Sequence, residues 1–141
     1  MHHSPRLPRI ALILYWIAMF VATHLPDIDR YEPEIARLIP RLDLFVHFGM
    51  YAGWTLLWSW LLSANGARLS RAAAGWLIAG GGVYALFDEL TQPLVGRETS
   101  MADYVFDVLG ICAVLLVLRC RQTRRTSRAV APATDGRAAS I

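Results

Sequence analysis

The chain has 141 residues, of which 55% are hydrophobic and 18% are charged, and its formal net charge is +3. This length allows one domain at most. A mean hydropathy of +0.38 is too apolar for an ordinary soluble domain of this size. The composition therefore argues against a soluble enzyme and favours an integral membrane protein.

Four apolar segments predict an all-α fold with four transmembrane helices, at about residues 9–25, 43–64, 70–91 and 101–120. Each segment is close to the roughly 20 residues that cross a bilayer core. A soluble four-helix bundle is the alternative. It would need a polar stripe on every helix, and these segments carry no charged residue across most of their length.

The basic residues predict how the helices are oriented. All 14 are arginines. They flank the predicted helices at three places: before the first (Arg6, Arg9), between the second and third (Arg68, Arg71), and after the fourth (Arg119, Arg121, Arg124, Arg125, Arg128). The positive-inside rule places these regions, and with them both termini, in the cytoplasm. The first outer loop also contains arginines (Arg30, Arg37, Arg41), but acidic residues accompany them, so this loop is placed outside. We expect no nucleic-acid partner.

The predicted domain covers residues 1–121, and its loops and ends give weaker expectations. The N-terminal apolar run resembles a signal peptide without a small-x-small cleavage site, so we expect an uncleaved anchor. In the first outer loop, residues 34–39 fit either a short interfacial helix or a plain loop. Residues 122–141 are rich in Arg, Ala, Thr and Ser without periodicity, and we expect a disordered cytoplasmic tail.

Glycines predict where helices pack closely. Gly49 and Gly53 are small residues four apart, which is a weak signal for close helix contact in lipid. The run from Gly80 to Gly82 indicates either tight packing against a neighbouring helix or a local unwinding.

Three predicted helix ends each carry two polar residues four positions apart. This spacing puts both side chains on one face of a helix. The predicted topology places all three ends at the same depth on the outer side of the membrane. They should therefore form one polar cluster, from the pairs Asp43 and His47, Asp88 and Gln92, and Asp103 and Asp107.

The residue types in this cluster indicate acid–base or binding chemistry. A carboxylate beside a histidine fixes its tautomer, so Asp43 would orient His47. Asp103 follows Ser100 by three residues, which is also the spacing of a helix cap. Arg97 either pairs with one of the acids or grips a phosphate or carboxylate of a ligand.

The charge balance narrows the choice of ligand. Carboxylates packed together cannot all ionise. A hard cation, a substrate ammonium or proton transfer fits such a site, and a phosphate could enter beside a bound metal. A divalent metal is thus a possible cofactor. The carboxylates that outnumber Arg97 and His47 are Asp43, Asp88, Glu89, Asp103 and Asp107.

Short motifs follow one another over roughly residues 10–120: Asp43-x-x-x-His47-Phe48 with Tyr51, Asp88-Glu89-x-x-Gln92, Gly96-Arg97, Asp103 and Gly110. Their order resembles the VanZ-like membrane protein family. The resemblance implies a multi-pass protein of the bacterial cytoplasmic membrane, and the family's founding member is associated with low-level teicoplanin resistance. Leu44 and Asp107 depart from the family's usual Lys and Asn, which puts any mechanism that needs the lysine charge in doubt.

Three functions fit these observations. A binding protein would recognise either the head group of a membrane lipid of the cell envelope or a lipid-linked or glycopeptide-type ligand. Its candidate binding residues are Arg97, Gln92, Asp103, Asp107 and Tyr51. A membrane-embedded enzyme would act on a lipid-linked substrate; its candidate catalytic residues are His47, Asp43, Asp88 and Glu89. A transport pathway is the third, but no charged residue continues the path into the cytoplasmic half of any predicted helix.

Overall fold

The computed structural model describes residues 6–25, 41–63 and 68–130, and these residues form helices without strands. The α-helices are α1 (Arg6–Thr23), α2 (Leu42–Leu62), α3 (Arg71–Thr91) and α4 (Met101–Val130), and a short 3-10 helix, η3 (Gln92–Val95), follows α3. The predicted all-α fold is confirmed. The residues 34–39 considered for an interfacial helix lie outside the described part of the chain.

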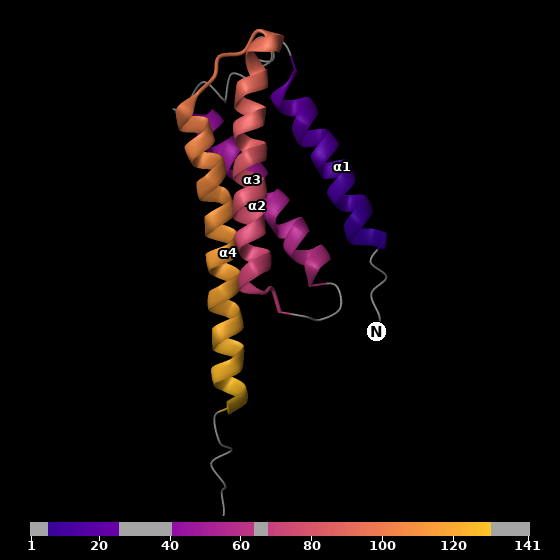
Figure 1. Ribbon diagram of the computed structural model, residues 1–141, viewed down its shortest axis with the longest axis vertical. Helices are drawn as coiled ribbons and strands as arrows, with labels where there is room; N and C mark the ends of the chain where they lie inside the picture. The colour runs from indigo at the N-terminus through magenta and orange to yellow at the C-terminus, as the bar shows by residue number, and fades with distance from the viewer. Residues whose placement is uncertain (1–5, 26–40, 64–67, 131–141) are drawn as a thin grey trace, which may run out of the picture.

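Successive helices run in opposite directions (Figure 1). The end of α1, the start of α2, the end of α3 with η3, and the start of α4 therefore gather at one end of the bundle (Figure 1). Ser70 caps α3 by accepting a hydrogen bond from the Ala73 N–H at 3.0 Å, and Ser100 caps α4 through the Asp103 N–H at 3.3 Å. These caps fix where the two helices begin.

The C-terminal helix is longer than the sequence indicates. We expected α4 to end near residue 120, with disorder from residue 122, but the helix continues to Val130. The prediction of disorder was thus wrong for residues 122–130. Arg, Gln and Ala have good helix propensity, and extending an existing helix avoids the cost of nucleation. Residues 131–141 lie outside the described part of the chain.

The bundle buries polar residues and exposes apolar ones. Large apolar side chains face outward from every α-helix, with Trp76 78% exposed and Val83 71% exposed on α3. By length and composition, two described helices are apolar enough to cross a membrane, α1 and the 101–125 part of α4. Length and composition thus support two of the four predicted spans; α2 and α3 mix their apolar residues with Gly, Trp and polar side chains.

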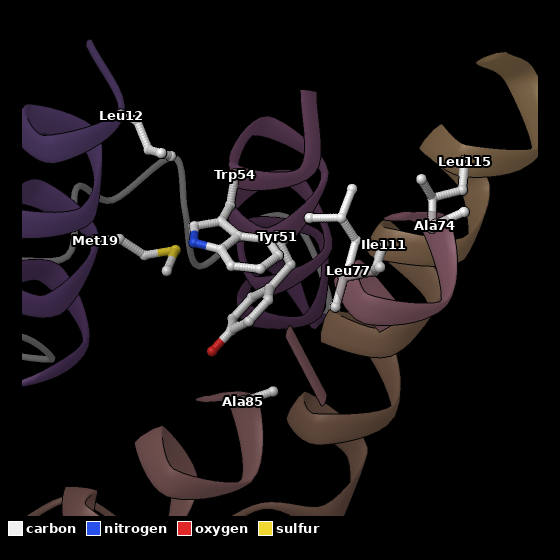
Figure 2. Packing of buried hydrophobic residues seen from close by; sticks show 9 residues of the cluster. All are labelled: Leu12, Met19, Tyr51, Trp54, Ala74, Leu77, Ala85, Ile111 and Leu115. Carbon is white, nitrogen blue, oxygen red and sulfur yellow. The ribbon is translucent and has the colours of Figure 1, made fainter. Parts of the chain in front are cut away.

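The apolar core centres on α2, whose Tyr51 and Trp54 lie between α1 and the other helices (Figure 2). Leu12 and Met19 contribute from α1 (Figure 2). Leu77 and Ala85 of α3 and Ile111 and Leu115 of α4 complete this core. The largest helix–helix contact is between α2 and α4.

Glycine makes that contact close. A Cβ on Gly110 would collide with the backbone carbonyl oxygen of Phe48 and come within 3.1 Å of the Ala52 nitrogen. The expected contact at Gly49 is absent, because nothing described lies within 4 Å of a Cβ there, whereas Gly53 packs against the Tyr15 ring. The close approach thus occurs on α4, where the sequence offered only a single glycine.

The run from Gly80 to Gly82 does not unwind α3, which is helical throughout. A Cβ on Gly81 would lie 2.6 Å from Ile111 Cδ1 and 3.0 Å from Trp54 Cζ3. The prediction of tight packing is confirmed at Gly81, and the alternative of local unwinding is wrong.

Adding a methyl group at Gly110 should destabilise the bundle. Gly110→Ala forces α2 and α4 apart, which we expect to cost about 1–3 kcal/mol, the usual range for overpacking. Gly49→Ala is the matched control, because its methyl group meets open space and it gains helix propensity. Thermal unfolding in detergent would measure both. A Gly110→Ala protein as stable as the Gly49→Ala protein would contradict the assigned contact.

Candidate functional site

Side chains from three helix ends form a buried polar cluster at one end of the bundle. His47 lies in the second turn of α2, Asp88 and Glu89 in the last turn of α3, and Asp103 and Asp107 in the first two turns of α4. Each of these five side chains is at most 6% exposed. Gln92 in η3 and Tyr51 on α2 are fully buried beside them. The predicted convergence of these helix ends is therefore present.

The histidine is held by α4. His47 Nδ1 lies 3.0 Å from Asp107 Oδ1, and His47 Nε2 lies 3.7 Å from Asp103 Oδ2. The contact with Asp107 holds the Nδ1 side of the imidazole ring and directs Nε2 toward Asp103. His47 therefore bridges two carboxyl groups one helical turn apart.

Asp43 does not have the role predicted for it. Its side chain is exposed and makes no hydrogen bond or ion pair with His47. The buried stripe of α2 runs through Leu44, His47 and Tyr51, so Asp43 lies just outside it. Asp107, expected among the binding residues, takes the orienting role instead.

Helix α1 also contributes, which the sequence analysis missed. The Thr23 hydroxyl donates to Asp88 Oδ1 at 2.8 Å, and His24 Nδ1 lies 3.6 Å from the same oxygen. His24 Nε2 is also 2.9 Å from the Thr91 hydroxyl. A signal was present in the sequence, because Thr23 and His24 lie at the end of the first apolar segment. The predicted topology places that end at the same membrane depth as the cluster.

The connection between α3 and α4 holds Glu89 in place. The Ser100 N–H donates to Glu89 Oε2 at 2.8 Å, and the Thr99 hydroxyl donates to the Glu89 carbonyl oxygen at 3.1 Å. One oxygen of this carboxylate is thus fixed by the backbone, and Oε1 has no hydrogen-bond partner among the described residues. Neither Thr99 nor Ser100 was expected to hold an acid of the cluster.

Arg97 lies at the edge of the cluster and is half-buried. Gly96 ends η3 with φ at 81°, a conformation that favours glycine, and turns the chain back toward α1. Arg97 then donates to the Thr23 carbonyl oxygen at 3.1 Å, and its charge acts on Asp88. Within the described part of the chain, this hydrogen bond goes to backbone, so the geometry leaves guanidinium donors for a further anionic group.

The cluster contains more hydrogen-bonding atoms than its own side chains use. Buried polar atoms are nearly always paired in folded proteins, so unpaired ones call for an explanation such as a ligand, ion or water. Within the described part of the chain, the buried atoms without a partner here are Tyr51 Oη, Asp88 Oδ2, Glu89 Oε1, both amide atoms of Gln92, Asp103 Oδ1 and Asp107 Oδ2.

Two apolar pockets lie between α1 and α3. One has a volume of about 400 Å³ and the other about 430 Å³, and Trp16 and Tyr84 line both. Tyr84 is one turn before Asp88 on α3. Both pockets thus reach to within about one helical turn of Asp88, and the first extends along α3 to Ala73.

No family model, curated protein or solved structure matches this chain. The resemblance to the VanZ-like family therefore depends on the motif residues alone. Of these, His47, Tyr51, Asp88, Glu89, Gln92 and Asp103 are buried in the cluster, and Arg97 borders it.

Removing the hydroxyl of Thr23 should weaken the link between α1 and α3. Thr23→Val keeps the shape but deprives Asp88 Oδ1 of its 2.8 Å donor, and we expect a loss of about 1–3 kcal/mol in unfolding free energy. Unfolding of Thr23→Val, Asp88→Ala and the double variant in detergent forms a thermodynamic cycle. Strictly additive effects would show that the two side chains do not interact.

Proposed function

We propose that the chain is a VanZ-like integral protein of the bacterial cytoplasmic membrane, with four transmembrane helices and both termini in the cytoplasm. Apolar side chains exposed on α2 and α3, such as Phe45 at 63% and Trp76 at 78%, give these helices a surface suited to lipid. The arginine-rich ends then lie inside, and the polar cluster lies at the extracytoplasmic end.

The cluster binds the polar head of a membrane-resident molecule, either an envelope lipid or a glycopeptide-type antibiotic with a lipid tail. The observation that carries this proposal is the set of buried atoms without partners among the described residues, above all the fully buried Gln92 amide. In the apolar part of a membrane, unpaired polar atoms and charges are costly, so a site that keeps them is expected to be functional. A bound head group would supply the missing hydrogen bonds.

The surroundings of the cluster suit such a molecule. Arg97 at the edge presents a guanidinium to a phosphate or carboxylate of the head group. The cavities beside Tyr84 give the hydrocarbon part of the same molecule an apolar place one turn below Asp88. By the resemblance alone, this binding is related to teicoplanin resistance.

A membrane-embedded enzyme is the second candidate, and the geometry of His47 favours it. The 3.0 Å contact of Nδ1 with Asp107 leaves Nε2 for proton transfer to a lipid-linked substrate. The two candidates differ in what His47→Ala does. Loss of turnover with substrate binding retained indicates an enzyme, whereas a change of affinity without any product indicates a binding protein.

The proposed topology predicts which residues are accessible from outside. In a variant with Cys112 and Cys120 replaced by Ala, a cysteine at the exposed position Glu98 should react with a membrane-impermeant maleimide in intact cells. A cysteine at Ser70, exposed at the opposite end of α3, should react only after lysis. The reverse pattern would invert the topology, and labelling of both in intact cells would contradict a spanning α3.

Replacing Gln92 should separate binding from folding. Gln92→Met keeps a similar shape and removes an unpaired buried amide, so the ligand-free protein should be as stable as the wild type or slightly more so. The same change should abolish stabilisation by the ligand, which reaches about 2.7 kcal/mol at 100-fold excess over Kd. Thermal unfolding in detergent would measure both, with added dioleoyl phosphatidylethanolamine, dioleoyl phosphatidylglycerol, cardiolipin or teicoplanin.

Asp43→Asn is the control for this experiment, because it removes an exposed carboxylate at the same end of the bundle. It should respond to each added molecule as the wild type does. Equal responses of Gln92→Met and wild type, or a wild type that none of the added molecules stabilises, would contradict the proposed head-group site.

A further inference from the structure

We propose that the cluster holds one divalent transition-metal ion, bound by His47 from α2, Glu89 from α3 and Asp107 from α4. This inference deepens the proposed function, because it states what the same site contains. The ion itself does not depend on a lipid ligand, so it can be tested without one.

The distances bring the three residues within reach of one ion. Each offers one ligand atom, and these atoms all lie within 4.8 Å of one another. Ligand atoms that bind one tetrahedral zinc ion at about 2.1 Å lie about 3.4 Å apart. Side-chain movements of about an ångström would therefore close the site. All three residues are at most 2% exposed, so bulk water does not compete for the ion.

Among the described residues, each carboxylate has one oxygen without a partner. Glu89 Oε2 accepts from the Ser100 N–H at 2.8 Å, and the partnerless oxygen of Glu89 is Oε1. Asp107 Oδ1 lies 3.0 Å from His47 Nδ1, and the partnerless oxygen of Asp107 is Oδ2. For Glu89, a hydrogen bond to one oxygen that orients the other is the usual arrangement of a carboxylate metal ligand.

The second nitrogen of His47 also has the surroundings of a metal ligand. If the ion replaces the proton between Nδ1 and Asp107, then Nε2–H faces Asp103, whose Oδ2 is 3.7 Å away. A histidine that binds a metal almost always donates its other N–H to a carboxylate or a carbonyl. Asp103 is thus a positioning residue for His47.

The charge of the cluster calls for a cation. Among the described residues, four buried carboxyl groups (Asp88, Glu89, Asp103, Asp107) are accompanied by the half-buried Arg97, and a divalent ion would offset two of their charges. One imidazole nitrogen with two carboxylate oxygens suits zinc, manganese or iron(II), whereas calcium and magnesium prefer oxygen ligands alone. Three protein ligands leave at least one coordination position for an oxygen of the bound molecule.

Metal content measures this proposal directly. The untagged protein, purified in detergent without chelators, should contain about one zinc, manganese or iron ion per chain by mass spectrometry of the elements, or take one up after incubation with the metal salt. His47→Gln and Glu89→Gln should each lose it. Asp103→Asn should weaken metal affinity about 10- to 100-fold, as outer-shell changes do.

Matched controls separate the ion from general damage. His24→Gln replaces a histidine outside the proposed ligand set, and Asp43→Asn removes an exposed carboxylate; both should keep the ion. If the ligand variants prove unstable, thermal unfolding of the wild type gives a second readout, because a chelator should lower its midpoint and zinc or manganese should restore it.

The failures of the two proposals are distinguishable. A wild type that stays metal-free after incubation with each ion, and whose unfolding no chelator or metal shifts, overturns the metal site even if lipids stabilise the protein. Metal retained in both His47→Gln and Glu89→Gln overturns it as well. Conversely, Gln92→Met should keep the ion while losing its response to lipid.

Discussion

The hydrogen bond between His47 and Asp107 joins the two helices that share the largest contact, and the polar end of the bundle is built around it. It forms because Gly110, three residues after Asp107, lets the backbone of α4 approach that of α2 at Phe48. A side chain at this position would move Asp107 away from the imidazole. The close contact between the backbones of α2 and α4 thus sets the distance between His47 and Asp107. A change in helix packing at Gly110 would therefore also change the geometry of the polar cluster.

Among the described residues, the buried acidic side chains and His47 lie at one end of the bundle, and an aromatic layer lies below them. Trp16 packs edge-on against Trp54 and Tyr84, with ring centroids 6.1 and 5.3 Å apart, and against Trp58 at 6.4 Å. These rings link α1, α2 and α3 where the cluster ends. Such a layer does not continue a path for ions or protons toward the arginine-rich end, which favours binding or chemistry at one face over transport through the protein.

Much of the site could be predicted because polar residues inside apolar segments are rare and their spacing is helical. His47, Asp88, Glu89, Gln92, Asp103 and Asp107 were all expected to meet, and they do. Partners were predicted less well. The i,i+4 rule paired His47 with Asp43 on its own helix, but the buried stripe of α2 passes through Leu44, and the partner comes from α4. The contribution of Thr23 and His24 was missed because the cluster was predicted mainly from carboxylate side chains, and neither residue carries one.

The sequence by itself determined that the chain is helical. It also determined that three helix ends carrying acidic residues would meet, and that the end of the bundle where they meet would be polar. These properties depend on local composition, on helical periodicity and on the alternation of direction along the chain. Only the tertiary structure decided which atoms pair. A shift of one residue along a helix turns a side chain by about 100°, so whether Asp43 or Leu44 faces the interior depends on how α2 rotates against α4. That rotation is fixed by the contact at Gly110, between residues far apart in the sequence.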